Sequence, residues 1–339
     1  MDVYIDRLAH GESYDGIPVK RFEDIDNIQE YYVINCASSA FWDISEFLFD
    51  HEVETVYHAL PLLEMLPEDQ EDVLEMFDTR SKYKHCINRE EDSSIYRLSV
   101  VITERCSLKC KNCTEYVPYI KNKEHEEIES CIQAVKKLLE AIGKLDSIMI
   151  QGGEIFTHPH WDILVKWCCE EKRIARVIIL TNATIIPKEW EALQNRKVLL
   201  ALDDYHEVSS RLLELKDMAR QKGIDHTVLR HDHWFDVADC GVITDDPAAL
   251  KQKFAVCQLK GCWVISGHFL YRCTTSYYKM KYMLSKKIEE DEDFIDLFTL
   301  SPEKIREQIK RLSKADYLSA CRYCRGTSTE NLIGVAEQL

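Results

Sequence analysis

Three cysteines in one short segment carry the clearest chemical signal of the sequence. Cys106, Cys110 and Cys113 are separated by three and then two residues, so their thiolates can turn toward one point. Cysteine-only ligation is the usual way to hold an iron–sulfur cluster. A 4Fe–4S cluster needs a ligand for each iron, so three local cysteines leave one iron open to a small molecule. A zinc site is the alternative, although zinc sites usually close with a fourth ligand nearby.

This cysteine loop resembles the signature of the radical S-adenosylmethionine (SAM) superfamily. In that family the open iron binds the amino and carboxylate groups of SAM. The reduced cluster then cleaves SAM to a 5′-deoxyadenosyl radical, which abstracts a hydrogen atom from the substrate. Gly152, Gly153 and Glu154 resemble the family's Gly-Gly-Glu motif, which binds the methionine amino group. Two glycines let the backbone approach a ligand closely, and the carboxylate of Glu154 can pair with an ammonium group.

Polar residues follow the next two predicted strands, at Thr181, Asn182, Asp203 and Tyr205. In the family these strand ends contact the carboxylate and ribose of SAM, and acidic and amide side chains suit ribose hydroxyls. Capping of the following helices is the alternative role for each of them. Arg230 and Trp234 are expected at the mouth of the substrate site, since arginine suits phosphate or carboxylate.

One residue departs from the family pattern. The position before the third cysteine usually holds an aromatic residue whose backbone meets the adenine of SAM, and here it is Asn112. Related sequences in sugar-modifying groups often read Cys-Lys-Asn-Cys, so the departure points to a subgroup. Tyr116 and Tyr119 follow closely and are expected to supply the missing stacking.

A second set of cysteines lies near the C-terminal end, at Cys257, Cys262, Cys273, Cys321 and Cys324. This set resembles the twitch version of the SPASM extension, which holds one auxiliary 4Fe–4S cluster with a hairpin and a later Cys-x2-Cys. The resemblance implies that the last three cysteines are ligands and that either or both of Cys257 and Cys262 complete the site. Zinc in the same cage is the alternative.

Composition narrows the class of protein. A length of 339 residues predicts about two domains. The net charge of −16 argues against nucleic acid or an anionic membrane surface as the main partner. No apolar run approaches the roughly 20 residues of a membrane helix, and the first residues lack the features of a signal peptide. We therefore expect a cytoplasmic protein whose 14 cysteines serve as metal ligands or buried residues rather than disulfides.

The elements that position these motifs alternate between strand and helix. Strands are predicted at 98–103, 146–151, 176–181, 197–202 and 226–230, and helices at 125–142, 161–171 and 209–222. Each motif follows the carboxyl end of a strand, where parallel α/β folds place their sites. The predicted fold class is α/β, and the resemblance implies a partial (β/α)6 radical SAM barrel.

The predicted domain organisation has four parts. Residues 1–80 form a small Rossmann-like α/β unit without a dinucleotide-binding glycine motif, and residues 81–95 form a linker. Residues 96–240 form the barrel, and residues 241–339 form the cysteine-rich twitch/SPASM-like extension.

The predicted function is that of a radical SAM oxidoreductase or epimerase acting on a sugar or nucleotide sugar. A flavodoxin- or ferredoxin-type protein would supply electrons. In an oxidation the auxiliary cluster takes the substrate's electron, whereas an epimerisation needs a thiol hydrogen donor, for which Cys240 is the candidate and burial the alternative. The competing hypotheses are a peptide-modifying radical SAM enzyme and a non-catalytic metal-stabilised scaffold.

Overall fold

The computed structural model describes residues 3–6, 11, 13–37, 41–65, 73–87, 95–237, 241–279, 293–327 and 331–339. Contacts divide the chain into two compact units, residues 1–66 with 82–88 and residues 67–81 with 89–339. No helix in these described ranges has the length and apolar character needed to cross a membrane.

The first unit contains two small sheets. In one, β3 (Ile17–Lys20) pairs in parallel with β1 (Tyr4–Ile5) and antiparallel with β2 (Ser13–Tyr14). In the other, β4 (Val33–Asn35) and β5 (Val56–His58) are parallel and are connected through α1 (Phe41–Asp50). Parallel neighbours need such a crossover, so this part of the unit is a βαβ arrangement.

A buried tyrosine links the helical part of the first unit to its parallel sheet. The helices after β5 are α2 (Leu60–Met65) and α3 (Val73–Ile87), of which residues 82–87 belong to this unit. The hydroxyl of Tyr83 donates a hydrogen bond to the carbonyl of Asn35 and accepts one from the Ala59 N–H at 2.7 Å. The linker predicted over 81–95 therefore begins as helix and continues through residues outside the described ranges.

The second unit is built on one large sheet. Five strands follow one another in parallel, namely β6 (Arg97–Val101), β7 (Leu145–Gln151), β8 (Ile174–Thr181), β9 (Val198–Asp204) and β10 (His226–Arg230). On the free side of β6 the sheet continues with β12 (Trp263–Ser266), β13 (Phe269–Tyr271) and β14 (Phe294–Asp296). Because β12 is parallel to β6, the sixth parallel strand comes from the segment that was predicted as a separate extension. The predicted α/β fold class with a partial barrel is confirmed.

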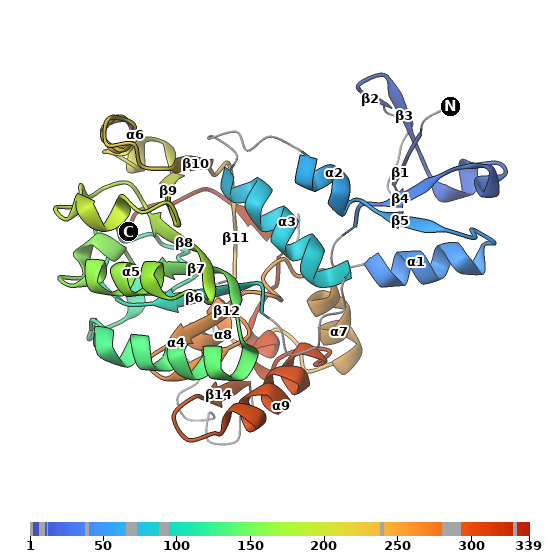
Figure 1. Ribbon diagram of the computed structural model, residues 1–339. Helices are drawn as coiled ribbons and strands as arrows, with labels where there is room; N and C mark the ends of the chain where they lie inside the picture. The colour runs from blue at the N-terminus through green and yellow to red at the C-terminus, as the bar shows by residue number, and fades with distance from the viewer. Residues whose placement is uncertain are drawn as a thin grey trace. The chain divides into compact units, whose positions relative to one another are not determined.

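Helices cover the outer face of this sheet. Figure 1 shows α6 (Leu212–Gln221), α5 (Trp161–Glu170), α4 (Ile128–Ile142) and α9 (Pro302–Ser313) following one another around it, with α5 and α9 both in contact with α4. After β10 this unit also contains α7 (Pro247–Ala255), α8 (Thr274–Tyr278) and a short antiparallel pair of β11 (Trp234–Phe235) with β15 (Leu332–Ile333). Helix α7 begins at Pro247, and the Asp246 carboxylate accepts hydrogen bonds from two of its first N–H groups.

The central strands are buried on both faces, as parallel strands covered by helices usually are. On β9, Leu200 packs into the cluster shared with the outer helices, while its neighbours Leu199 and Ala201 belong to a smaller cluster on the inner face with Met149 and Ile178. The inner face nearest the strand ends is left to polar residues. Packing of the apolar core on both faces of the sheet thereby fixes the positions of the strand ends that carry the motifs.

We predict that Leu200→Ala destabilises the second unit. Its side chain is fully buried, so truncation leaves a cavity and should lower the free energy of unfolding by about 2–5 kcal/mol. Leu213→Ala on α6 is the matched control, because that side chain is 77% exposed and its loss should change little. Chemical denaturation followed by tryptophan fluorescence measures both. Equal stability of the two variants would contradict this placement of the core.

Candidate active site

The cysteine loop follows the end of β6 and closes as two tight turns. The N–H of Cys113 donates to the carbonyl of Cys110 at 3.2 Å, and the N–H of Tyr116 donates to the carbonyl of Cys113 at 3.0 Å. Cys110 is buried, and Cys106 and Cys113 are half-buried. Burial raises the pKa of both Cys106 and Cys113 to about 12. As thiols these groups would release protons on binding a metal cluster.

Polar donors point at the sulfurs of Cys106 and Cys110. The Sγ of Cys106 accepts from the N–H of Leu108 and from the Asn182 side-chain amide, both at 3.4 Å. The Sγ of Cys110 accepts from the Gln338 side-chain amide at 3.1 Å. Hydrogen bonds to the sulfurs are a general feature of protein-bound iron–sulfur clusters and tune their potential. The donor set therefore fits such a cluster.

Gln338 is a site residue that the sequence did not reveal. Residues near the C-terminal end pair with the cysteine loop, with the N–H of Lys111 donating to the carbonyl of Glu337 at 2.7 Å and the N–H of Leu339 donating to the carbonyl of Lys109 at 3.0 Å. This pairing places the amide of Gln338 against Cys110. No local pattern announces the contact, because the two residues lie far apart in the sequence.

Gly152 and Gly153 allow the end of β7 to pass directly against the start of the cysteine loop. The N–H of Gly153 donates to the carbonyl of Thr103 at 2.9 Å, and the N–H of Glu154 donates to the carbonyl of Arg105 at 2.8 Å. A Cβ on Gly152 would lie 2.5 Å from the Thr103 oxygen. A Cβ on Gly153 would lie 2.5 Å from the Arg105 oxygen and 2.9 Å from the Cys106 Cβ. Both glycines are therefore needed for this close approach, whatever else they do.

The carboxylate of Glu154 joins the ends of β7 and β8. It accepts hydrogen bonds from the Phe156 N–H at 3.1 Å, the Thr181 hydroxyl at 2.9 Å and the Asn182 N–H at 2.9 Å. Burial is the main cause that raises the pKa of Glu154 to about 7. A carboxylate offers about four acceptor positions, so three protein donors leave room for about one more. The same Asn182 contacts Cys106, so Glu154, Thr181 and Asn182 lie together beside the cysteine loop.

Asp203 and Tyr205 form a second group at the end of β9. The Tyr205 hydroxyl donates to one carboxylate oxygen of Asp203 at 2.9 Å, and the Nε2 of His231 lies 2.8 Å from the other. The ring of Trp234 packs edge-on against Tyr205, with 5.2 Å between the centroids. Arg230 instead pairs with Asp232 at the exposed surface. Trp234 thus contacts the Asp203–Tyr205 pair, whereas the Arg230 guanidinium pairs with Asp232 instead.

Glu115 is a further carboxylate that sequence reasoning missed. It follows the third cysteine by two residues and accepts a hydrogen bond from the Gln151 amide at 3.3 Å. Burial, and then the charges of Asp203 and Glu154, raise its pKa to about 8. These three acidic groups therefore act on one another at the same end of the sheet.

Two tyrosines expected to stack on a ligand are engaged with the protein. Tyr116 is buried, donates to the carbonyl of Val237 at 3.0 Å and stacks on Tyr278. The hydroxyl of Tyr119 donates to the carbonyl of Lys111. Packing rather than ligand stacking explains Tyr116, so that part of the expectation is wrong.

Cys240, the candidate hydrogen donor, lies outside the described residues.

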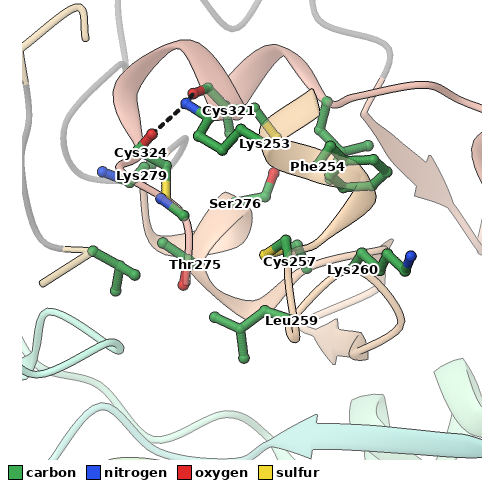
Figure 2. Close-up of a pocket in the computed structure, with 15 residues that line it drawn as sticks. Lys253, Phe254, Cys257, Leu259, Lys260, Thr275, Ser276, Lys279, Cys321 and Cys324 are labelled. Carbon is green, nitrogen blue, oxygen red and sulfur yellow. Dashed lines mark hydrogen bonds between the residues drawn. The ribbon is translucent and has the colours of Figure 1, made fainter. Parts of the chain in front are cut away.

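Four of the five C-terminal cysteines line one cavity (Figure 2). Cys257 follows α7, Cys273 precedes α8, and Cys321 and Cys324 lie in and just after the 3-10 helix Ser319–Tyr323. Burial raises the pKa of Cys321 to about 12 and holds that of Cys273 well above its ordinary value. Burial also raises the pKa of Cys324, while the charges of Lys279 and Lys253 act in the opposite direction. Cys262 is not among the residues that line this cavity.

Within the described residues, neither cysteine set converges on a single metal ion. A zinc ion holds its thiolates about 2.3 Å from one point. Within the described ranges, no three His, Cys, Asp or Glu side chains converge in a way that could hold one metal ion. The several irons of a cluster space its thiolate ligands more widely than a single ion does. The absence of a single-ion arrangement in the described residues therefore concerns a site such as zinc and not an iron–sulfur cluster.

We predict that Gly153→Ala disrupts the meeting of β7 with the cysteine loop. The new methyl group would meet backbone atoms of Arg105 that cannot swing away, at a cost of about 1–3 kcal/mol in the free energy of unfolding. Gly261→Ala is the control, because a Cβ there meets nothing within 4 Å. Thermal unfolding and iron content after reconstitution report the effect. A Gly153→Ala protein as stable as the control would show that the loop shifts freely.

Comparison with known proteins identifies the domain. Residues 100–230 match the Radical SAM superfamily. A 91-residue stretch is 33% identical to the antilisterial bacteriocin subtilosin biosynthesis protein AlbA of Bacillus subtilis (strain 168), covering 26% of this chain and 18% of that protein. The chain thus matches less than a fifth of the length of this curated relative. Residues 100–230 form a radical SAM domain, and a domain of this superfamily implies a 4Fe–4S cluster and SAM.

Solved structures give weaker similarities. BtrN in complex with AdoMet and 2-DOIA is 16% identical, with a TM-score of 0.44, over 73% of this chain and 99% of that one. SuiB of Streptococcus suis bound to S-adenosylmethionine is 20% identical, with a TM-score of 0.35, over 55% of this chain and 45% of that one. Native anSMEcpe with bound AdoMet and Cp18Cys peptide is 14% identical, with a TM-score of 0.41, over 68% and 88% of the two chains.

Proposed function

We propose that this chain is a radical SAM enzyme that abstracts a hydrogen atom from a sugar or nucleotide sugar. Cys106, Cys110 and Cys113 would hold the 4Fe–4S cluster, with SAM at its open iron. When bound and reduced by a flavodoxin- or ferredoxin-type protein, the cluster supplies the electron that cleaves SAM to a 5′-deoxyadenosyl radical. The observation that carries the proposal is the hydrogen-bonded path from Cys106 through Asn182 to Glu154, within the matched domain.

The chain's own residues have distinct roles in this proposal. The remaining acceptor position of Glu154 would take the ammonium group of SAM. Asp203 and Tyr205 would position the ribose, since a carboxylate accepts from hydroxyls. SAM carries both a sulfonium and an ammonium charge. The acidic end formed by Glu115, Glu154 and Asp203 suits such a cation.

The second cysteine set extends the proposal. Cys257, Cys273, Cys321 and Cys324 line one cavity and would hold an auxiliary cluster, while Cys262 would remain a structural thiol. Such a cluster supplies an electron acceptor for an oxidation, in which the substrate loses a hydrogen atom and then a proton and an electron. An epimerisation would instead require a thiol donor, and Cys240 remains the candidate for that role.

A peptide substrate is the second candidate. The stretch of 33% identity to a bacteriocin biosynthesis protein favours it. The Cys110-Lys-Asn-Cys113 and His233-Trp-Phe-Asp236 stretches, which resemble sugar-modifying groups, favour the sugar. Turnover in the presence of candidate nucleotide sugars and of candidate peptides separates the two, because only the true substrate accelerates SAM cleavage and gains a mass change.

We predict that the anaerobically reconstituted, reduced protein forms 5′-deoxyadenosine from SAM, as detected by mass spectrometry. Cys110→Ala should abolish the product, because one ligand of the SAM-binding cluster is lost. Cys36→Ala is the control, since that thiol is exposed in the first unit and should leave the rate unchanged.

The negative result is equally informative. A protein that carries its full iron and binds no SAM, or forms no 5′-deoxyadenosine, would exclude the enzyme. It would leave the metal-stabilised scaffold as the function to pursue.

We predict that Cys257→Ala and Cys262→Ala differ in iron content. Cys257 lines the cavity with the other three cysteines, so its loss should remove about half of the iron, whereas Cys262→Ala should retain it. Iron per chain and the absorbance of the reconstituted protein measure the difference. Loss of iron in Cys262→Ala alone would reverse the ligand assignment.

A further inference from the structure

Among the described residues, the cavity lined by the four C-terminal cysteines is also lined by lysines and by no acidic residue. The chain has 59 acidic and 43 basic residues, so a random patch of it would be acidic. Yet the described residues that line this cavity include Lys253, Lys260 and Lys279 and no carboxylate. The buried carboxylate of Asp293 accepts a hydrogen bond from the Ala320 N–H and is not among the lining residues. The excess of basic over acidic residues around this cavity is therefore local and opposite in sign to the net charge of the whole chain.

Lys253 forms hydrogen bonds to the backbone of both Cys321 and Cys324. The ammonium of Lys253, on α7, donates to the carbonyl of Cys321 at 2.6 Å and to the carbonyl of Cys324 at 2.5 Å (Figure 2). A single side chain from α7 therefore closes the Cys321–Cys324 turn. Lys279, fully buried, donates in the same way to the carbonyl of Tyr323 between them.

The chain makes room for Lys253 at Gly326. This glycine has a φ of +77°, a left-handed conformation that favours glycine. A Cβ there would lie 2.9 Å from the Cγ of Lys253 and 3.2 Å from its Cδ. The lysine stem is thus packed against backbone, so its head group is held at the two carbonyls.

A fixed cation beside four thiolates has a definite electrostatic consequence. A cluster with four thiolate ligands is an anion, and each added electron increases its negative charge. A nearby ammonium in a poorly solvated site therefore stabilises the reduced form more than the oxidised form. Hydrogen bonding and charge around a cluster are among the means by which proteins set its reduction potential.

We infer that Lys253 is a positioning residue of the C-terminal cluster site, which holds the Cys321–Cys324 turn and raises the reduction potential of the cluster bound there. This inference rests on the proposed auxiliary cluster. A raised potential makes the site a better electron acceptor. Lys253 contacts neither the reacting atoms nor SAM, so its effect is exerted through the cysteines.

The test isolates the C-terminal site in the full-length chain. In a parent variant with Cys106, Cys110 and Cys113 all changed to alanine, only the C-terminal cysteines can hold a cluster. The midpoint potential of the reconstituted parent is measured by potentiometric titration monitored by electron paramagnetic resonance. Lys253→Met, Lys253→Arg and Lys251→Met are then compared with it, and iron per chain is measured for each.

The expected result is a lower potential in Lys253→Met and a potential close to the parent's in Lys253→Arg. Lys251→Met is the matched control, since this residue lies on the same helix but its exposed head group pairs with Asp316. It should leave the potential unchanged. If Lys253→Met holds too little iron, Lys253→Gln removes the charge while keeping a donor and should show the lower potential.

The other outcomes overturn the inference. A potential in Lys253→Met equal to the parent's would show that the lysine charge does not act on the cluster. Loss of iron in Lys253→Arg as well as in Lys253→Met and Lys253→Gln would show that the shape of lysine, and not its charge, is needed. A parent that binds no cluster would instead refute the proposed auxiliary site itself, and is recognised before any Lys253 variant is made.

Discussion

The candidate active site depends on the hydrogen bonds that the buried Glu154 carboxylate accepts. A buried carboxylate is costly unless it is hydrogen-bonded, and here the donors come from the turn after β7 and from the end of β8. Beside this carboxylate, Gly152 and Gly153 let the end of β7 run against the backbone that leads from β6 into the cysteine loop. The Glu154 carboxylate thus joins the ends of β7 and β8, and the backbone N–H groups of Gly153 and Glu154 join them to the segment that follows β6.

The large sheet could be predicted because its signals are local. Each of its first five parallel strands contains a short apolar run, three of them are followed by a predicted helix, and the observed β7 and β9 begin and end within two residues of the predicted ranges. The partner of β12 could not be predicted in the same way. Its pairing with β6 joins segments separated by most of the domain, and no sequence period encodes such a contact.

The same distinction explains which site residues were found. Cys106, Cys110 and Cys113 stand close together in the sequence, so their spacing carries the signal. Gln338 reaches Cys110 only through the fold. The sequence likewise does not distinguish Cys257 from Cys262, because both precede the hairpin at plausible spacings, whereas the fold places only Cys257 among the residues that line the shared cavity. The prediction that Tyr116 stacks on a ligand was wrong, because an aromatic residue at this position can equally be part of the core, where Tyr116 packs against Tyr278.

The two cysteine sets lie in opposite electrostatic surroundings. Around the cysteine loop, the acidic groups Glu115, Glu154 and Asp203 face a site whose expected ligand, SAM, brings positive charge. Around the C-terminal cavity, lysines face a site whose expected occupant is an anion. In a chain with a net charge of −16, these cations come from α7 and from Lys279 just after α8, and backbone carbonyls accept hydrogen bonds from them. With the proposed auxiliary cluster bound there, the lysines would favour its reduction, as the acceptance of an electron from a substrate requires.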